Sequence, residues 1–213
     1  MQMDMSGIKP DIRLVPVDIG DYETIKGRGM TFHTRVFDAI DMGRLFLMDM
    51  TAFGNLMRME TVVFTPLELD GPIYSMDKIC VIGRSTLVLE LYDTTVSHPD
   101  LSALDVVKQK YSLLPSYDPG DHPYHTFRAR ESDYKRGFGI RNKISLMEKE
   151  YQDSYFQILK TCDPIDPKIK KQKNLEFSDC LFSNGGPAVD QFKKMIGQEK
   201  TEEFLKRYMF CSL

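Results

Sequence analysis

The clearest pattern along the chain is an alternation of apolar and polar residues between residues 43 and 92. The alternating runs are separated by turn-forming segments such as Gly54-Asn55 and Gly83-Arg84-Ser85. A period of two between short turns is typical of antiparallel strands. The pattern therefore predicts a four-stranded meander. Its strands are Gly43–Phe53, Leu56–Thr65, Ile73–Ile82 and Thr86–Tyr92.

Helical spacing of apolar residues predicts helices on both sides of the meander. One mainly helical stretch, Asp21–Met42, precedes it. The helices expected after it are Leu101–Leu113, Lys143–Cys162 and Pro187–Phe210, the last broken at Gly197. A fifth strand is predicted at Tyr124–Arg130, and the basic segment Pro167–Lys173 is predicted to be a loop. This order predicts an α+β fold in which helices cover both faces of an antiparallel sheet.

Composition narrows the class of protein. The 213 residues are 42% hydrophobic and 28% charged, which predicts one globular domain over residues 1–213. The net charge of −3 lacks the basic bias of nucleic-acid binders. No apolar run approaches the ~20 residues of a membrane span, and the start MQMDMSGIKPDIRLVP does not resemble a signal peptide. Four widely spaced cysteines indicate reduced thiols. We expect a cytoplasmic protein without nucleic acid or membrane as a partner.

Motifs for nucleotide binding, zinc proteolysis and hydrolase chemistry are absent from the sequence. His122 and His125, three residues apart beside Asp121, fit either a metal pair or an ordinary solvated loop, and no metal site is predicted. The meander carries Asp49, Glu60 and Asp77 within apolar surroundings on successive strands. A carboxyl group on an inward-facing strand position has a raised pKa and is suited to donating a proton. The alternative is that each faces solvent or pairs with Arg44 or Arg58.

Two segments resemble the ferredoxin-dependent bilin reductases, including the red chlorophyll catabolite reductase branch. The first, VVFTPLELDGPIYSMDKICVIG, places Phe64, Pro72 and Asp77 in that family's register. The second is the C-terminal FKKMIGQEKTEEFLKRYMF. A third segment, LYDTTVSHPDLS, is similar to the family's Asp-rich stretch. The resemblance covers residues 40–213.

The resemblance implies a three-layer α/β/α sandwich with a central antiparallel sheet and a linear tetrapyrrole between the sheet and the C-terminal helices. It implies no tightly bound cofactor, with single electrons arriving from reduced ferredoxin or flavodoxin. Asp77 matches the family's catalytic Asp, and Glu60 falls where the phycobilin-forming members have a His. Asp49 lies near the family's first acidic position, and Asn184 near its C-terminal Asp or Asn.

Tetrapyrrole propionates require cations, and guanidinium groups bind carboxylates with two hydrogen bonds. The candidates are Arg58, Arg84, Arg128 and Arg130, each of which is otherwise an ordinary surface residue. An acidic ferredoxin requires a basic docking patch on its partner. The resemblance also implies that the protein is a monomer. The candidate lysines are Lys168, Lys170, Lys171, Lys173, Lys193 and Lys194, and Lys206 and Arg207 lie near the C-terminus.

Three functions remain open on the sequence. The first is a reductase of a biliverdin-like bilin or chlorophyll catabolite, with Asp77 and Glu60 as proton donors. The second is a non-catalytic bilin or haem carrier of the same fold, which the missing family His favours. The third is an α+β domain of unrelated function in which the meander carboxylates are structural.

Overall fold

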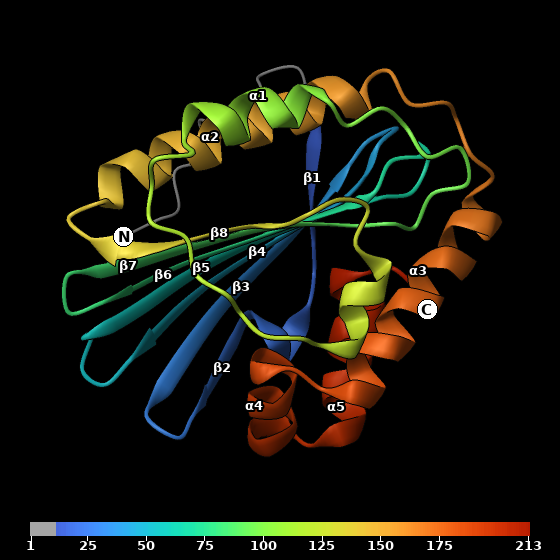
Figure 1. Cartoon of the computed structure of the whole chain (residues 1–213). Helices are drawn as coiled ribbons and strands as arrows, with labels where there is room; N and C mark the ends of the chain where they lie inside the picture. Colours follow the sequence, from blue (N-terminus) through green and yellow to red (C-terminus); the bar gives the residue numbers. More distant parts are fainter. Residues whose placement is uncertain (1–11) are drawn as a thin grey trace.

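The computed structural model describes residues 12–213, which contain an antiparallel sheet flanked by helices (Figure 1). The strands follow the order β1-β3-β4-β5-β6-β7-β8, with β2 also paired to β3. Their bounds are β1 Leu14–Val17, β2 Thr24–Gly27, β3 Met30–Ala39, β4 Gly43–Ala52, β5 Met57–Pro66, β6 Ile73–Val81, β7 Arg84–Tyr92 and β8 Asp133–Phe138. Neighbouring strands are mostly consecutive in the chain, so short turns build most of the sheet.

Helices form a layer on each face of the sheet (Figure 1). One layer is α1 (Ala103–Lys110) and α2 (Arg141–Leu159). The other contains α3 and the helices that follow it. Their bounds are α3 Pro167–Asn184, α4 Pro187–Ile196, α5 Gln198–Glu203 and the π-helical turn η4 Phe204–Met209. Two short 3₁₀ helices, η2 (Gly20–Glu23) and η3 (Pro123–Phe127), lie in the connections. The architecture is the predicted three-layer α/β/α sandwich.

Alternation along the strands divides the core into two halves. Leu45 and Leu47 of β4 pack in the half that contains α1 and α2, together with Tyr151 and Tyr155 of α2. Phe46 and Met48 point the other way, into the half formed by α3, α4, α5 and η4. Every strand residue can therefore be assigned to the α1–α2 face or the C-terminal helix face by its register.

The four strands of the predicted meander are confirmed as β4 to β7, each within two residues of the expected ends. The helical prediction for Asp21–Met42 is wrong, because this segment forms η2, β2 and β3. The buried residues on one side of β3 are Phe32, Thr34 and Val36. This period of two is typical of a strand, and pairing with β4 stabilises it.

Two further predictions are corrected. Tyr124–Arg130 is not a strand, since its first half belongs to η3; the last strand is β8, which begins at Asp133. Pro167–Lys173 is not a loop but the start of α3. Asp166 accepts a hydrogen bond from the Lys168 backbone N–H at 2.8 Å, and Pro167 occupies the first helical position. The break at Gly197, between α4 and α5, is confirmed.

The N-terminal residues 1–11, on which the signal-peptide prediction depends, lie outside the described residues. Among the described residues, none of the helices combines the length and the apolar composition of a membrane span.

Candidate functional site

Asp77 lies on β6 and faces the C-terminal helix layer. Its cross-strand neighbour on β5 is Thr61, whose hydroxyl donates a hydrogen bond of 2.5 Å to Asp77 Oδ1. Burial raises the pKa of Asp77 from 3.8 to about 6, the charge of Glu90 adds to this, and the Thr61 hydrogen bond opposes it. A carboxyl group with this pKa can hold and release a proton near neutral pH.

Glu60 and Asp49 lie on the opposite face of the sheet from Asp77. They are cross-strand neighbours on β5 and β4, in the register of the residues that pack under α2. Glu60 forms an ion pair of 2.7 Å with Lys78, which also bonds Glu148 of α2 at 2.7 Å. The structure therefore does not bring the three predicted carboxylates together, and Thr61, not Glu60, lies beside Asp77.

Asp49 is held by a different cation. Its Oδ2 lies 3.8 Å from Arg35 Nη2. Burial raises the pKa of Asp49, Arg35 opposes the rise and Glu60 adds to it. The pair of Asp49 and Glu60 thus belongs to a charged cluster with Arg35 and Lys78 on the α1–α2 face.

Glu90 of β7 is a second buried carboxylate on the Asp77 face. Tyr92 donates a hydrogen bond of 2.5 Å to Glu90 Oε2, and Tyr134 of β8 donates one to Oε1. Arg128 Nη2 donates to Tyr134 and lies 3.4 Å from Glu90 Oε1. These contacts satisfy both carboxylate oxygens and tie β7, β8 and the segment after η3 together.

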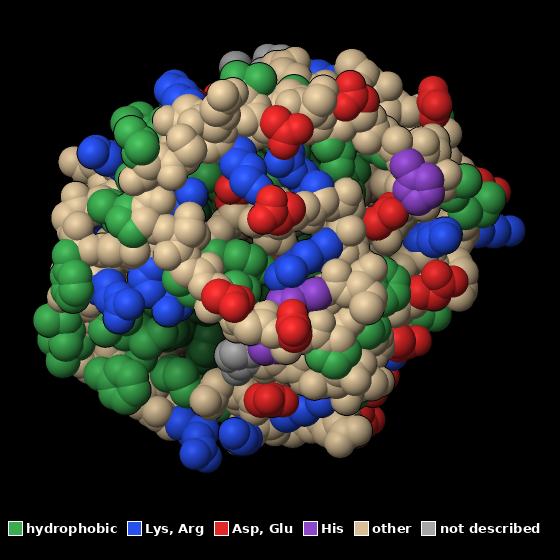
Figure 2. Space-filling model, viewed as in Figure 1, with side chains coloured by type: hydrophobic (Ala, Val, Ile, Leu, Met, Phe, Trp, Pro, Cys, Tyr) green, Lys and Arg blue, Asp and Glu red, His purple; other side chains and the backbone are tan. Residues whose placement is uncertain are grey.

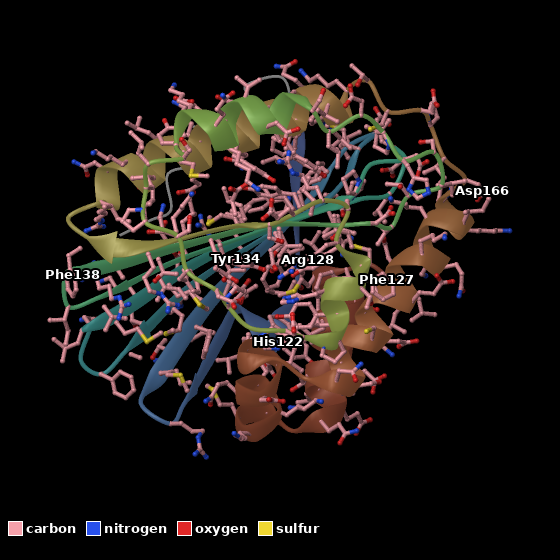
Figure 3. All side chains as sticks on the ribbon, in the orientation of Figure 1. His122, Phe127, Arg128, Tyr134, Phe138 and Asp166 are labelled. Atoms are coloured by element: carbon pink, nitrogen blue, oxygen red, sulfur yellow. The ribbon has the colours of Figure 1, made fainter. Side chains whose placement is uncertain are left out.

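The segment around η3 crosses this face of the sheet, and Figure 3 shows Tyr134, Arg128 and His122 close together where it does so. His125 Nδ1 accepts a hydrogen bond from the His122 backbone N–H at 3.2 Å, so in the neutral ring the proton is on Nε2. Nε2 lies 3.8 Å from Glu90 Oε1. Burial lowers the pKa of His125, and the Arg128 charge lowers it further, which favours the neutral ring.

Between Asp77 and the hairpin ends, the sheet face is apolar. Met57, Met59 and Ile79 share the register of Asp77 and Thr61 and are half-buried. Figure 2 shows a hollow in the molecule bordered largely by hydrophobic side chains, with Lys and Arg side chains beside it. An apolar floor with a few polar groups at its border is typical of a site for a flat organic ligand.

Arg136 and Arg84, on the paired strands β8 and β7, carry guanidinium groups on this same face. Arg136 of β8 is opposite Thr86 of β7, to which its Nε donates a hydrogen bond of 3.2 Å, and it stacks 3.6 Å from the ring centre of Tyr117. Arg84, at the start of β7, is exposed and is a diagonal cross-strand neighbour of Arg136. Both can therefore meet an anionic group at the border of the apolar floor.

The other predicted ligand-binding residues lie elsewhere or are already bonded. Arg58 is exposed in the register of Glu60, on the α1–α2 face. Arg130 is also on that side, where it bonds Asp105 at 2.5 Å and the Leu101 carbonyl at 3.2 Å. Arg128 shares the Asp77 face but is held by Glu90 and Tyr134, while the amide of exposed Asn184 donates to Cys180 O within α3.

Lys170 cannot belong to the predicted docking patch, because it is 0% exposed. Its ammonium group donates to the Gly71 carbonyl at 2.5 Å, to the Thr94 carbonyl at 2.7 Å and to Thr94 Oγ1 at 3.1 Å. Lys193 donates to Phe182 O at 2.7 Å, and buried Lys206 pairs with Asp179 and Glu202, each at 2.6 Å. The exposed lysines of the proposed patch are Lys168, Lys171 and Lys194, with Lys173 half-buried.

Sequence reasoning missed Thr61, Glu90, Tyr134 and Arg136. Glu90 carried a usable signal, because it is the one carboxylate in the apolar run TLVLELY and meets the criterion applied to Asp77. Tyr134 and Arg136 point to the same face of β8. They gave no signal because the fifth strand was predicted at Tyr124–Arg130, before β8. Thr61 carries no charge and gave no signal.

A cavity of about 450 Å³ lies away from this site, between η2, α5 and η4. Its lining includes Tyr22, Glu203 and Tyr208, and none of its residues belongs to β5, β6, β7 or β8. Tyr22 donates a hydrogen bond of 2.9 Å to Glu203 there. Within residues 12–213, no group of three or more His, Cys, Asp and Glu side chains is placed to hold a metal ion.

The raised pKa of Asp77 predicts a pH-dependent stability difference between the natural protein and the Asp77→Asn variant. The folded state binds the Asp77 proton more tightly than the unfolded state does. Protonation of Asp77 therefore contributes stability that is fully present below pH 3.8 and is lost as the pH rises through about 6. Asn carries no such charge, so the variant should become relatively more stable from pH 4 to 7, by roughly 3 kcal/mol at most. Urea unfolding of both proteins at several pH values measures this difference. A difference that does not change with pH would contradict the assignment.

Fold and site together define an α/β/α sandwich with a proton-holding carboxyl group facing its C-terminal helices. Among solved structures, a similar one is that of phytochromobilin synthase from tomato in complex with biliverdin, with a TM-score of 0.69 and 13% sequence identity. The match covers 94% of this chain and 78% of the tomato chain. No family model and no curated protein sequence matches this chain. The two proteins share a fold at low sequence identity.

Proposed function

We propose that this protein reduces a linear tetrapyrrole of the biliverdin class on the Asp77 face of the sheet. One observation carries the proposal: a carboxyl group with a pKa of about 6 adjoins an apolar sheet surface with guanidinium groups at its border. The similar fold of a protein solved with biliverdin supports this choice of ligand. A linear tetrapyrrole has a flat apolar body and carboxylate side chains, which match the floor and the border respectively.

Reduction of one double bond consumes two electrons and two protons. The electrons would come singly from a reduced ferredoxin or flavodoxin, with exposed Lys168, Lys171 and Lys194 as docking cations. Asp77 would donate one of these protons to the reduced pigment, regain a proton from solvent and then donate the second. Because Thr61 donates to Oδ1, a proton held by the carboxyl group is expected on Oδ2. Glu60 has no part in this proposal, because it lies on the other face of the sheet.

Arg136→Gln should weaken binding of a tetrapyrrole with free propionates by about tenfold, since a charge-assisted hydrogen bond is lost. The same variant should bind the dimethyl ester of biliverdin as the natural protein does. Titration followed by absorption measures both affinities. Arg130→Gln is the matched control, because Arg130 lies on the α1–α2 face, and its affinity for biliverdin should not change. Equal losses in both Arg variants would contradict the placement of the ligand.

The direct test is an anaerobic assay with biliverdin and a reduced ferredoxin system, followed by visible absorption. A product absorbing at shorter wavelength, or a transient long-wavelength radical band, supports the reductase. A bound-pigment spectrum that stays constant under reducing conditions indicates a carrier instead of a reductase. No spectral change on adding pigment would reject tetrapyrrole binding.

A further inference from the structure

Four turns come together at one end of the sheet. The turn between β2 and β3 contacts the β4–β5 turn, since the Phe53 N–H donates to Gly29 O at 3.3 Å. The β4–β5 turn contacts the β6–β7 turn through the Ile82 N–H and Leu56 O at 3.4 Å. Arg84, after that turn, pairs with Phe138 at the end of β8. The turns thus form one continuous row, here called the hairpin-end row. Figure 1 shows it as the fan of hairpin ends opposite α3.

Large apolar side chains project from this row. Phe53, Leu56, Ile82 and Phe138 are 66%, 60%, 75% and 73% exposed, respectively. Figure 3 shows Phe138 at the outer end of the sheet, away from the Tyr134 and Arg128 cluster. Such a group of exposed apolar side chains marks a contact surface rather than ordinary surface scatter.

The charge of the row is one-sided. The segments 27–30, 51–58, 80–85 and 137–143 contain Arg28, Arg58, Arg84, Arg141 and Lys143 and no Asp or Glu, and all five cations are exposed. The whole chain, by contrast, has 28 basic and 31 acidic residues. Apolar tips among cations fit an anionic surface with an apolar interior.

The backbone of Ile82 gives an independent argument. Ile82 and Gly83 form the two-residue turn between β6 and β7, with φ angles of 43° and 78°. A β-branched residue is strained at positive φ, and Asn is the favoured residue at this position of such a hairpin turn. Folding therefore does not explain an isoleucine here, whereas an apolar contact outside the protein does.

We propose that the hairpin-end row docks on an anionic lipid membrane surface, with Phe53, Leu56, Ile82 and Phe138 entering the interface. These exposed apolar side chains project from turns at the outer end of the sheet, which suits insertion between lipid headgroups. The sequence predicted no membrane partner because the four apolar residues come from three segments and form no apolar run. The proposal is independent of the reductase activity and would stand if that activity failed.

Co-sedimentation with vesicles tests the proposal. The full chain should bind phosphatidylcholine vesicles containing about one-third phosphatidylserine, and bind pure phosphatidylcholine at least about tenfold more weakly. Ile82→Asn and Phe138→Gln should each lower binding by about tenfold. Since Asn suits the turn, Ile82→Asn should keep or raise the urea midpoint, so lost binding will not reflect misfolding. Leu113→Gln, at a site that is 98% exposed elsewhere, is the matched control and should bind like the natural protein.

Charge and competing occupants are tested in the same way. Arg28→Gln with Arg141→Gln should remove most of the preference for anionic vesicles and its dependence on salt. Four results would overturn the proposal. The natural protein fails to bind anionic vesicles, or the control variant loses as much binding as the tip variants. Alternatively, vesicles are not bound and Ile82→Asn either dissociates a dimer in analytical ultracentrifugation or weakens binding to an acidic ferredoxin.

Discussion

Asp77→Asn should leave biliverdin bound but unreduced. Asn keeps the size of the side chain and can still accept the hydrogen bond of Thr61 Oγ1, so the apolar floor and the guanidinium border remain in place. It has no proton to donate near neutral pH, and loss of a general acid costs about 10² to 10⁴ in rate. Single-turnover reduction with a chemically reduced ferredoxin, followed by absorption, measures this rate separately from pigment binding.

Glu60→Gln is the matched control for that experiment. Glu60 is on the neighbouring strand but faces α2, where it pairs with Lys78. Its variant should reduce the pigment at a rate within about twofold of the natural protein, because loss of a half-buried ion pair affects local stability rather than the opposite face. If Glu60→Gln were as slow as Asp77→Asn, the pigment would have to lie on the α1–α2 side, and the proposed site would be wrong.

Lys170→Ala should lower the free energy of unfolding by about 3 kcal/mol or more. The substitution removes the donor for the Gly71 carbonyl, the Thr94 carbonyl and Thr94 Oγ1, all buried around a side chain that is 0% exposed. Buried acceptors left without a donor cost about 1–3 kcal/mol each, and a cavity adds to this. Urea unfolding at constant pH measures the loss.

The neighbouring residue provides the comparison. Lys171 is exposed on the same helix, and Lys171→Ala should change stability by less than about 0.5 kcal/mol. If Lys170→Ala were equally mild, the buried ammonium would not be holding the segments around Gly71 and Thr94 to α3. Because Lys171 is exposed and Lys170 is buried, only the charge of Lys171 is available to an electron donor. Lys171→Ala is therefore expected to weaken docking of that donor.

The sequence by itself determined the meander and the contrast between its two faces. The alternation of β5 placed Met57, Met59, Thr61 and Val63 opposite Glu60, and the structure confirms this register. Such patterns are local, because a strand with two differently buried faces shows its period in a few residues. Asp77 was found for the same reason, as a charge interrupting an apolar strand.

Only the tertiary structure decided which face the C-terminal helices cover. It also decided the register of β5 and β6, which pairs Asp77 with Thr61 and so places Glu60 on the other face of the sheet. It also decided that Lys170 is buried, since its acceptors lie 99 and 76 residues away in the chain. The strand β3 was misread because its period shows clearly only when β4 pairs beside it. The hairpin-end row could not be read from any one segment, because its charge and its apolar tips come from four turns that meet only in the folded sheet. Local periodicity records burial within one element, whereas long-range contacts carry no signal in a single sequence.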